Sequence, residues 1–205
     1  MRIAIVGGTG PFGRALARQL GKAGHGVVVG SRDAGRAQEI AAELGLEGAA
    51  NEAAVGGAEL VVLATKAEAA VATARDLASA IGDTPVLSVA SELVRTPAGL
   101  APRDGRSIAE ELRTVLEGPV VAGLHSLAAS NLGSDERPDE DALVCGDDAE
   151  AKALALELAE SITSGRVYDA GPLASARALE GLTAVIVNLN KRYRGHAGLR
   201  VTGLG

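Results

Sequence analysis

The chain has 205 residues, which suits one compact α/β domain with a small C-terminal addition. It carries 20 basic and 26 acidic residues, for a formal net charge of -6, and only three aromatic residues, so nucleic acid is not an expected partner. No stretch approaches the roughly 20 apolar residues of a membrane span, and the single cysteine, Cys145, cannot form an internal disulfide. These features predict a cytoplasmic protein.

Short β-branched runs alternate with helical patterns along most of the chain. We expect strands at residues 3–6, 27–30, 60–64, 85–89, 120–122, 142–145 and 166–169, and helices at residues 12–23, 34–44, 68–81, 107–117, 147–162 and 172–194. This alternation predicts an α/β fold, doubly wound and Rossmann-type, with a mainly parallel sheet and a small C-terminal α/β extension. We place a Rossmann dinucleotide-binding domain over residues 1–125 and a smaller C-terminal part over residues 126–205.

A glycine-rich turn, Gly8-Thr9-Gly10-Pro11-Phe12-Gly13, follows the first expected strand and opens the first expected helix. In that context the G-x-G-x-x-G spacing predicts a dinucleotide-binding site. The first glycine permits the tight turn, and the second lets the pyrophosphate approach the backbone. The third permits close packing of helix on strand, and the start of the helix faces the anion.

The end of the second expected strand indicates which dinucleotide binds. An NAD site usually places an acidic residue there, on the ribose 2′-hydroxyl. This chain has Ser31 and Arg32, with Arg36 one helical turn further on. A hydroxyl and two guanidinium groups suit a 2′-phosphate and favour NADP(H). Asp33 is the competing feature, because its carboxylate could still reach the ribose.

Motifs spread over nearly the whole chain resemble the family of NADPH-dependent coenzyme F420 reductases (F420:NADP oxidoreductases). They are Gly7-Gly8-Thr9-Gly10 with Gly13, Val29-Gly30-Ser31-Arg32, Thr73-Ala74-Arg75-Asp76-Leu77, Leu124-His125-Ser126-Leu127, Val144-Cys145-Gly146-Asp147-Asp148, and Asp169-Ala170-Gly171-Pro172-Leu173 followed by Arg177, Leu179-Glu180 and Leu182-Thr183. The resemblance implies hydride transfer between NADP(H) and coenzyme F420, an 8-hydroxy-5-deazaflavin. It also implies a homodimer, and no metal is needed.

The resemblance also implies roles for individual residues. Thr9, Ser31, Arg32 and Arg36 match the family's contacts with the NADP phosphates. His125 and Leu127 match positions beside the deazaflavin, and Thr183 matches a position near its hydroxyl edge. The C-terminal part therefore completes the deazaflavin pocket.

At two places the chain differs from the usual family pattern. Ala64-Thr65-Lys66 stands where the family has a Pro-Trp-type segment, and Gly181 stands where a serine is common near Thr183. Both differences lie on the side expected for the second substrate.

Several polar residues leave two interpretations open. His125, the one catalytic candidate, could donate a hydrogen bond to a substrate oxygen or be satisfied by backbone at a strand end. Thr65 follows a strand at its carboxyl end, where open α/β sheets bind ligands, and is expected to contact cofactor. Asn188 lies in an apolar helical run and needs a partner, which could be a second subunit, a backbone carbonyl or substrate.

Three other functions remain alternatives. The first is an NADPH-dependent imine reductase resembling pyrroline-5-carboxylate reductases, which usually add a longer helical dimerisation region. A related option is a metalloreductase that uses NADPH and a flavin, and the third is a non-catalytic NADP(H) sensor. Turnover of deazaflavin by NADPH separates these alternatives from the F420 reductase.

Overall fold

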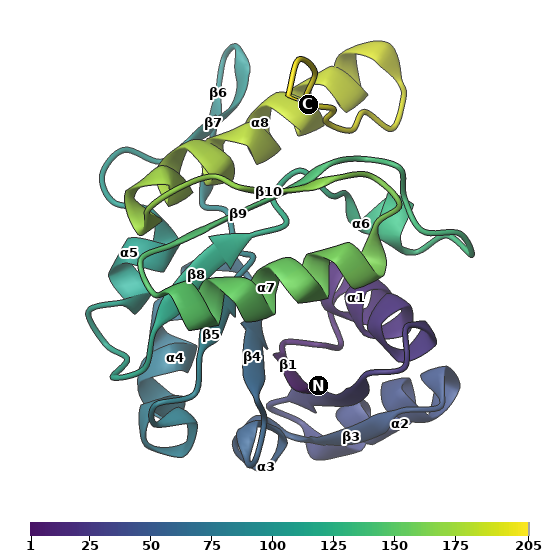
Figure 1. Ribbon diagram of the computed structural model, residues 1–205, viewed down its shortest axis with the longest axis vertical. Coiled ribbons are helices and arrows are strands. Elements are labelled where there is room, and N and C mark those ends of the chain that lie inside the picture. The colour runs from purple at the N-terminus through teal and green to yellow at the C-terminus, as the bar shows by residue number, and fades with distance from the viewer. Residues whose placement is uncertain (205) are drawn as a thin grey trace.

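An eight-stranded sheet forms the centre of the molecule in the computed structural model, which describes residues 1–204 (Figure 1). Its order is β10-β9-β8-β5-β4-β1-β2-β3. The strands are β1 (Arg2–Val6), β2 (Gly26–Ser31), β3 (Glu47–Ala50), β4 (Leu60–Leu63), β5 (Val86–Ser88), β8 (Val120–Gly123), β9 (Ala142–Gly146) and β10 (Val167–Asp169). Neighbours are parallel except β8 and β9, which are antiparallel. The predicted Rossmann-type, mainly parallel α/β fold is confirmed.

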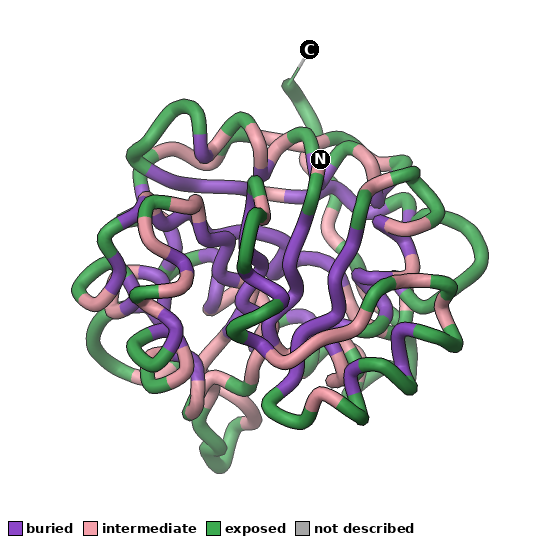
Figure 2. The backbone as a smooth tube through the Cα atoms, turned by 90° about the horizontal axis from the view of Figure 1, so that it is seen from below, coloured by how far each residue is buried: buried purple, intermediate pink, exposed green. Residues whose placement is uncertain are grey.

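Helices cover both faces of this sheet (Figure 1). They are α1 (Pro11–Lys22), α2 (Ala34–Leu44), α3 (Asn51–Val55), α4 (Ala67–Ile81), α5 (Ile108–Leu112), α6 (Ala129–Leu132), α7 (Ala149–Ile162) and α8 (Ala176–Tyr193), with a 3-10 turn at Leu173–Ser175. Figure 2 shows the central strands as buried backbone. Alternate residues of β1 explain this burial: Ile3 and Ile5 pack with α1, α2 and α7, whereas Ala4 and Val6 pack with α4, α5 and α8.

Five elements were not predicted from the sequence. β3 and α3 occupy residues 47–55, where alanine and glycine give no strand-like run. An antiparallel hairpin, β6 (Leu93–Thr96) and β7 (Gly99–Pro102), lies outside the main sheet and is partly exposed, so it needs no apolar alternation. The fifth is the single turn of α6.

Two predicted helices have different ends in the structure. The capping box at Ser107 is present as expected, with reciprocal bonds to Glu110, but α5 ends at Leu112 and not near residue 117. The last helix starts at Ala176, because Pro172 is extended (ψ 166°) and a 3-10 turn follows it. β9 and β10 belong to the same sheet as β1, and α7 packs in the same core. The division into two parts at residue 125 stays a prediction.

The last helix is fixed to the β6–β7 hairpin by Asn188. Its Oδ1 accepts from the Leu100 N–H at 2.9 Å, and its Nδ2 donates to the Leu100 carbonyl at 2.8 Å. Of the three partners considered for Asn188, the structure shows the backbone one, in the N–H and carbonyl of Leu100. α8 is thereby held in place, and it carries Thr183 toward the site.

Glu180 joins α8 to α5. Its side chain is buried, and Oε1 accepts from the Ala109 N–H at 3.3 Å. Burial raises the pKa of this carboxyl to about 7, although the backbone N–H groups of Ile108 and Ala109 oppose the rise. Below about pH 7 the folded protein therefore favours the protonated carboxyl.

We expect the Glu180→Gln variant to lose the part of the pH dependence of stability that comes from this carboxyl. Because the folded pKa lies above the ordinary value of 4.5, ionisation is costlier in the folded state, and stability falls as pH rises toward 7. Between pH 5 and pH 7 the wild-type protein should lose about 2 kcal/mol relative to the variant. Urea unfolding at several pH values measures this difference. Glu39→Gln, on the exposed face of α2, is the control, and parallel curves for wild type and Glu180→Gln would contradict the expectation.

Candidate active site

The glycine turn joins β1 to α1 at the carboxyl edge of the sheet. The Gly8 N–H donates to the carbonyls of Ile5 (3.1 Å) and Gly30 (3.0 Å), which ties the turn to β2. Gly7 has a φ of 81°. α1 begins at Pro11 and its N-cap, Gly10, has no side chain, so no side-chain cap bonds the N–H groups of the first turn, and they are available to an anion.

The three glycines of the motif differ in what surrounds them. A Cβ on Gly8 would lie 2.9 Å from the Ile5 carbonyl oxygen, and one on Gly13 would lie 2.7 Å from Gly8 Cα. A Cβ on Gly10 would meet only the Gly7 carbonyl oxygen, at 3.4 Å. Gly8 and Gly13 are therefore required by packing, whereas Gly10 keeps open the space that a pyrophosphate would use.

The carboxyl end of β2 presents a hydroxyl and two guanidinium groups. Ser31 is buried, and Arg32 and Arg36 are exposed. Asp33 caps α2, since its Oδ1 accepts from the Arg36 N–H at 3.1 Å. Within residues 1–204 neither Arg32 nor Arg36 has an acidic partner, so both are available to an anion.

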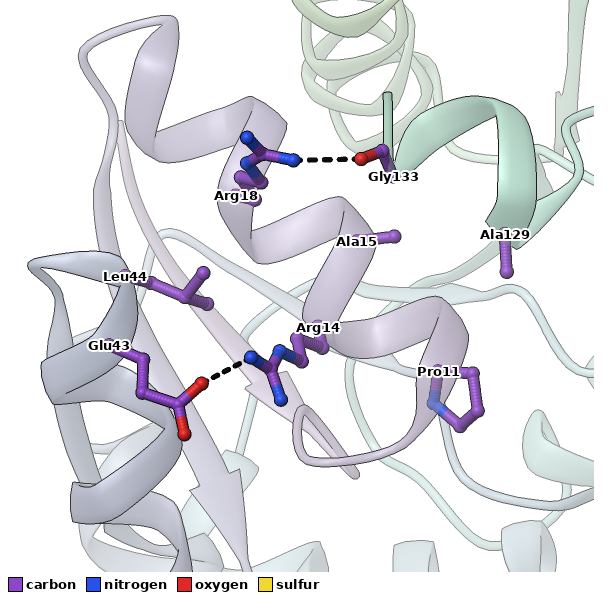
Figure 3. A pocket seen from close by; sticks show the side chains of 8 residues that line it. All are labelled: Pro11, Arg14, Ala15, Arg18, Glu43, Leu44, Ala129 and Gly133. Atoms are coloured by element: carbon purple, nitrogen blue, oxygen red, sulfur yellow. Dashed lines mark hydrogen bonds and ion pairs between the residues drawn. The ribbon is translucent and has the colours of Figure 1, made fainter. Parts of the chain in front are cut away.

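Two other arginines lie in a groove of about 400 Å³ between α1, α2 and α6 (Figure 3). Arg14 pairs with Glu43, and Arg18 donates to the Gly133 carbonyl at 2.7 Å and pairs with Asp135. These cations are already neutralised. The groove therefore lacks the free positive charge found at Arg32 and Arg36.

Two adjoining cavities lie along the carboxyl edge of the sheet. The larger, of about 510 Å³, is lined by the glycine turn, the ends of β2 and β4, and one face of α4. The smaller, of about 250 Å³, is lined by residues that follow β5 and β8 and by α8. Both are lined by Phe12 and by Ala64-Thr65-Lys66. Two bound molecules could therefore meet at this shared wall.

The structure brings most of the predicted site residues to these cavities. The larger contains Thr9, Gly10, Pro11, Phe12, Ser31, Arg32 and Thr65; the smaller contains Phe12, Thr65, His125, Leu127 and Thr183. Three predicted site residues, Gly8, Gly13 and Arg36, line neither cavity; Arg36 lies on the first turn of α2, four residues after Arg32. The Thr65 hydroxyl is buried without a hydrogen-bond partner in residues 1–204, as expected for a group that awaits a ligand.

A hydrogen-bonded chain links α8 to the loops after β5 and β8. The Thr183 hydroxyl donates to the His125 carbonyl at 3.2 Å and lies 2.9 Å from Ser91 Oγ. Since a hydroxyl has one proton, Ser91 is the donor in the second bond. Thr183 is thus held at the wall of the smaller cavity by groups from two other elements.

His125 is held as a neutral imidazole. Its Nε2 lies 3.2 Å from the Ala90 carbonyl, which can only accept, so Nε2 carries the proton. Burial lowers the pKa of the ring to about 4, and the bond to Ala90 offsets only part of this. Nδ1 is buried without a partner in residues 1–204. This geometry favours backbone satisfaction of Nε2 and leaves Nδ1 as an acceptor.

The sequence model of the family described as NADP oxidoreductase, coenzyme F420-dependent, matches residues 2–92. The F420-dependent NADP reductase of Methanothermobacter marburgensis is 35% identical over 223 residues, covering 100% of this chain and 99% of that protein. The chain belongs to this family.

A crystal structure of a proposed F420-dependent NADP reductase from Arthrobacter sp. FB24 is similar to this structure over nearly the whole chain. It is 28% identical, with a TM-score of 0.86, and covers 99% of this chain and 100% of that one. An imine reductase from Streptomyces aurantiacus shares the fold with a TM-score of 0.66 at 23% identity, but this chain spans only 62% of it.

Of the two departures from the usual family pattern, only Ala64-Thr65-Lys66 lines the cavities, and Gly181 lines neither. Ala64-Thr65-Lys66 forms the wall shared by both cavities. Gly181 faces the hairpin, where a Cβ would lie 3.6 Å from Pro102 Cγ, an ordinary contact. The first departure therefore changes the site's lining, whereas nothing in the packing around Gly181 requires glycine there.

Two of the polar residues that line the cavities, Ser91 and Asn51, were not predicted from the sequence as site residues. Ser91 follows β5, and the rule that ligands bind at the carboxyl ends of parallel strands would have indicated it. Asn51 lines the larger cavity directly after β3. It carried no signal, because β3 itself was not expected.

Neither a metal site nor a reactive thiol is found among residues 1–204. Over residues 1–204, no group of three or more His, Cys, Asp or Glu side chains is placed to hold a metal ion. Burial raises the pKa of the Cys145 thiol to about 12, so this thiol is a packing residue. In the described part of the chain, no helix combines the length and the hydropathy that a bilayer span needs.

Proposed function

We propose that this chain transfers a hydride between NADP(H) and coenzyme F420. The observation that carries the proposal is the pair of adjoining cavities, one lined by a dinucleotide turn and the other by the family's deazaflavin positions, with a common wall at Phe12 and Ala64-Thr65-Lys66. Such an arrangement suits two flat ring systems that must meet face to face.

The residues of the larger cavity fit NADP(H). The glycine turn and the start of α1 would hold the pyrophosphate, and Ser31 and Arg32 would hold the 2′-phosphate. Arg36, on α2 outside the cavity lining, would be a further contact of that phosphate. Asp33, the residue that could have favoured NAD(H), is committed to capping α2. When bound, NADP(H) supplies the hydride chemistry at nicotinamide C4, and the Thr65 hydroxyl lies where it could contact the ribose or the nicotinamide.

The residues of the smaller cavity position the deazaflavin. His125, Leu127 and Thr183 line it, with Ser91 bonded to Thr183. His125 is neutral at physiological pH, so we assign it a positioning role through Nδ1 as a hydrogen-bond acceptor, not proton donation. The part of the chain after residue 125 thus completes the substrate pocket through Leu127 and Thr183.

The test is to mix the protein with NADPH and oxidised F420 and to follow the loss of the deazaflavin's visible absorbance. Rapid turnover with NADPH, and much slower turnover with NADH, is the expected result. NADPH binding without F420 turnover would overturn the proposal and favour an imine reductase or an NADP(H) sensor. Cyclic imines with NADPH, under the same conditions, separate those two.

We also propose a cytoplasmic homodimer. The single, buried Cys145 suits a reducing compartment. The exposed apolar side chains of Val185 (53%), Leu189 (41%) and Tyr193 (72%) recur every four residues and form one stripe along α8. A stripe of this kind marks a contact surface.

Light scattering should therefore report a dimer for the wild-type protein and a monomer for the double variant Val185→Glu, Leu189→Glu. Two charges placed opposite each other in an apolar seam are strongly unfavourable. Val187→Glu is the matched control, because Val187 lies on another side of α8 and is also exposed. A monomeric wild type would contradict the dimer.

A further inference from the structure

Asn51 lies beside the proposed 2′-phosphate site. β3 pairs with β2 so that Ala50, the last residue of β3, is opposite Ser31, and Asn51 follows it as the first residue of α3. Its side chain is 8% exposed and lines the larger cavity together with Ser31 and Arg32. A buried amide thus lines the same cavity as Ser31 and Arg32, the two residues proposed to hold the 2′-phosphate.

The protein leaves this amide incompletely bonded. Asn51 Oδ1 is buried and has no hydrogen-bond partner in residues 1–204. Buried polar atoms in native proteins are nearly always bonded, so an unpaired one points to a missing partner. A Cβ on Gly30 would lie 2.9 Å from this oxygen, so glycine at position 30 makes room for the amide. The protein alone does not require an amide here, because an apolar side chain at position 51 would leave no buried oxygen unpaired.

The surrounding charges indicate the ligand group. No acidic residue lines the larger cavity, and Arg32 and Lys66 contribute positive charge. A phosphorylated ribose offers acceptors on the 2′-phosphate and a donor on the free 3′-hydroxyl. A carboxamide matches both, since Nδ2 donates and Oδ1 accepts.

We propose that Asn51 is a specificity-determining residue for NADP(H), whose carboxamide hydrogen-bonds the phosphorylated ribose. The proposal rests on the proposed binding of NADP(H) in the larger cavity. It assigns to Asn51 part of the preference for NADP(H) over NAD(H), together with Ser31 and Arg32.

The test is to titrate the full-length Asn51→Asp variant with NADPH and with NADH, without F420. The substitution keeps the shape of the side chain and places a carboxylate in place of the donor beside the phosphate dianion. We expect the Kd of NADPH to rise at least about tenfold and that of NADH to change less than about twofold. Gln38→Glu, the same amide-to-acid change on the exposed face of α2, should alter neither value by more than about twofold.

Asn51→Ala is the second variant, in case Asn51→Asp does not fold. It should weaken NADPH selectively by about three- to tenfold. Equal weakening of NADPH and NADH, or no change in either, would overturn the proposal. So would a loss that disappears when hypoxanthine replaces adenine in the dinucleotide, because the amide would then contact the base.

Failure of this inference is distinguishable from failure of the proposed function. Wild-type protein that binds NADPH and reduces no F420 leaves the Asn51 comparison valid. Wild-type protein that binds NADPH no better than NADH overturns the cofactor assignment itself, and with it the role given to Asn51.

Discussion

Replacing Arg32 by alanine should raise the Kd and the KM of NADPH about 10- to 100-fold and leave those of NADH within about twofold. The guanidinium is exposed and has no acidic partner among residues 1–204, so the expected loss is that of charge-assisted bonds to the 2′-phosphate, about 1.5–3 kcal/mol. NADH has a hydroxyl at that position and nothing for Arg32 to neutralise. Titration with both dinucleotides measures the two effects.

Arg14→Ala is the matched control for Arg32→Ala. Arg14 is also an arginine near the glycine turn, but it pairs with Glu43 in the groove of Figure 3. Its removal should not change the ratio of NADPH to NADH affinity. Because neither arginine is buried, the unfolding free energy should change by less than about 0.5 kcal/mol in either variant. Equal losses of NADPH and NADH in Arg32→Ala would end the assignment of this side chain to the 2′-phosphate.

The strands buried on both sides are the ones with the clearest signal in the sequence. β1, β2, β4 and β5 are short apolar runs bounded by turns, because a parallel sheet covered by helices needs apolar residues on both faces. β3 lies at the edge of the sheet and has no fully buried residue, so nothing in Glu47–Ala50 marks it as a strand. Asn51 was missed for that reason alone.

Site residues could be predicted where a local motif carries the chemistry. The glycine turn, Ser31 and Arg32 are such motifs, and the structure places them around one cavity. The protonation of His125 could not be predicted in this way. It depends on the Ala90 carbonyl, 35 residues away in the chain, and on burial that only the folded structure produces.

The role of Asp33 also depends on the folded structure and could not be decided from a local motif. From the sequence, its carboxylate competed with Arg32 for the ribose, because both follow β2. The structure gives this carboxylate to the Arg36 N–H at 3.1 Å, as the cap of α2. A helix cap and an NAD-type ribose contact both call for an acidic residue after a strand, and only the geometry separates them.

Gly13→Ala and Gly10→Ala should both weaken dinucleotide binding, but only Gly13→Ala should also destabilise the protein. A Cβ on Gly13 would lie 2.7 Å from the Gly7 carbonyl oxygen and from Gly8 Cα, so α1 must move away from the turn. Such overpacking costs about 1–3 kcal/mol of unfolding free energy. The displaced turn should then bind NADPH and NADH equally poorly.

Gly10→Ala separates the ligand's requirement from the protein's own. A Cβ there would meet only the Gly7 carbonyl oxygen at 3.4 Å, so the melting temperature should stay close to that of the wild type. The added methyl instead occupies space needed by the pyrophosphate, and both dinucleotides should bind about 10- to 100-fold more weakly. Thermal unfolding without ligand, together with titration of NADPH and NADH, measures the two quantities. Both dinucleotides should be affected equally, because they share the pyrophosphate and differ only at the 2′-position near Arg32. If Gly10→Ala bound NADPH normally, the pyrophosphate would not lie over this turn.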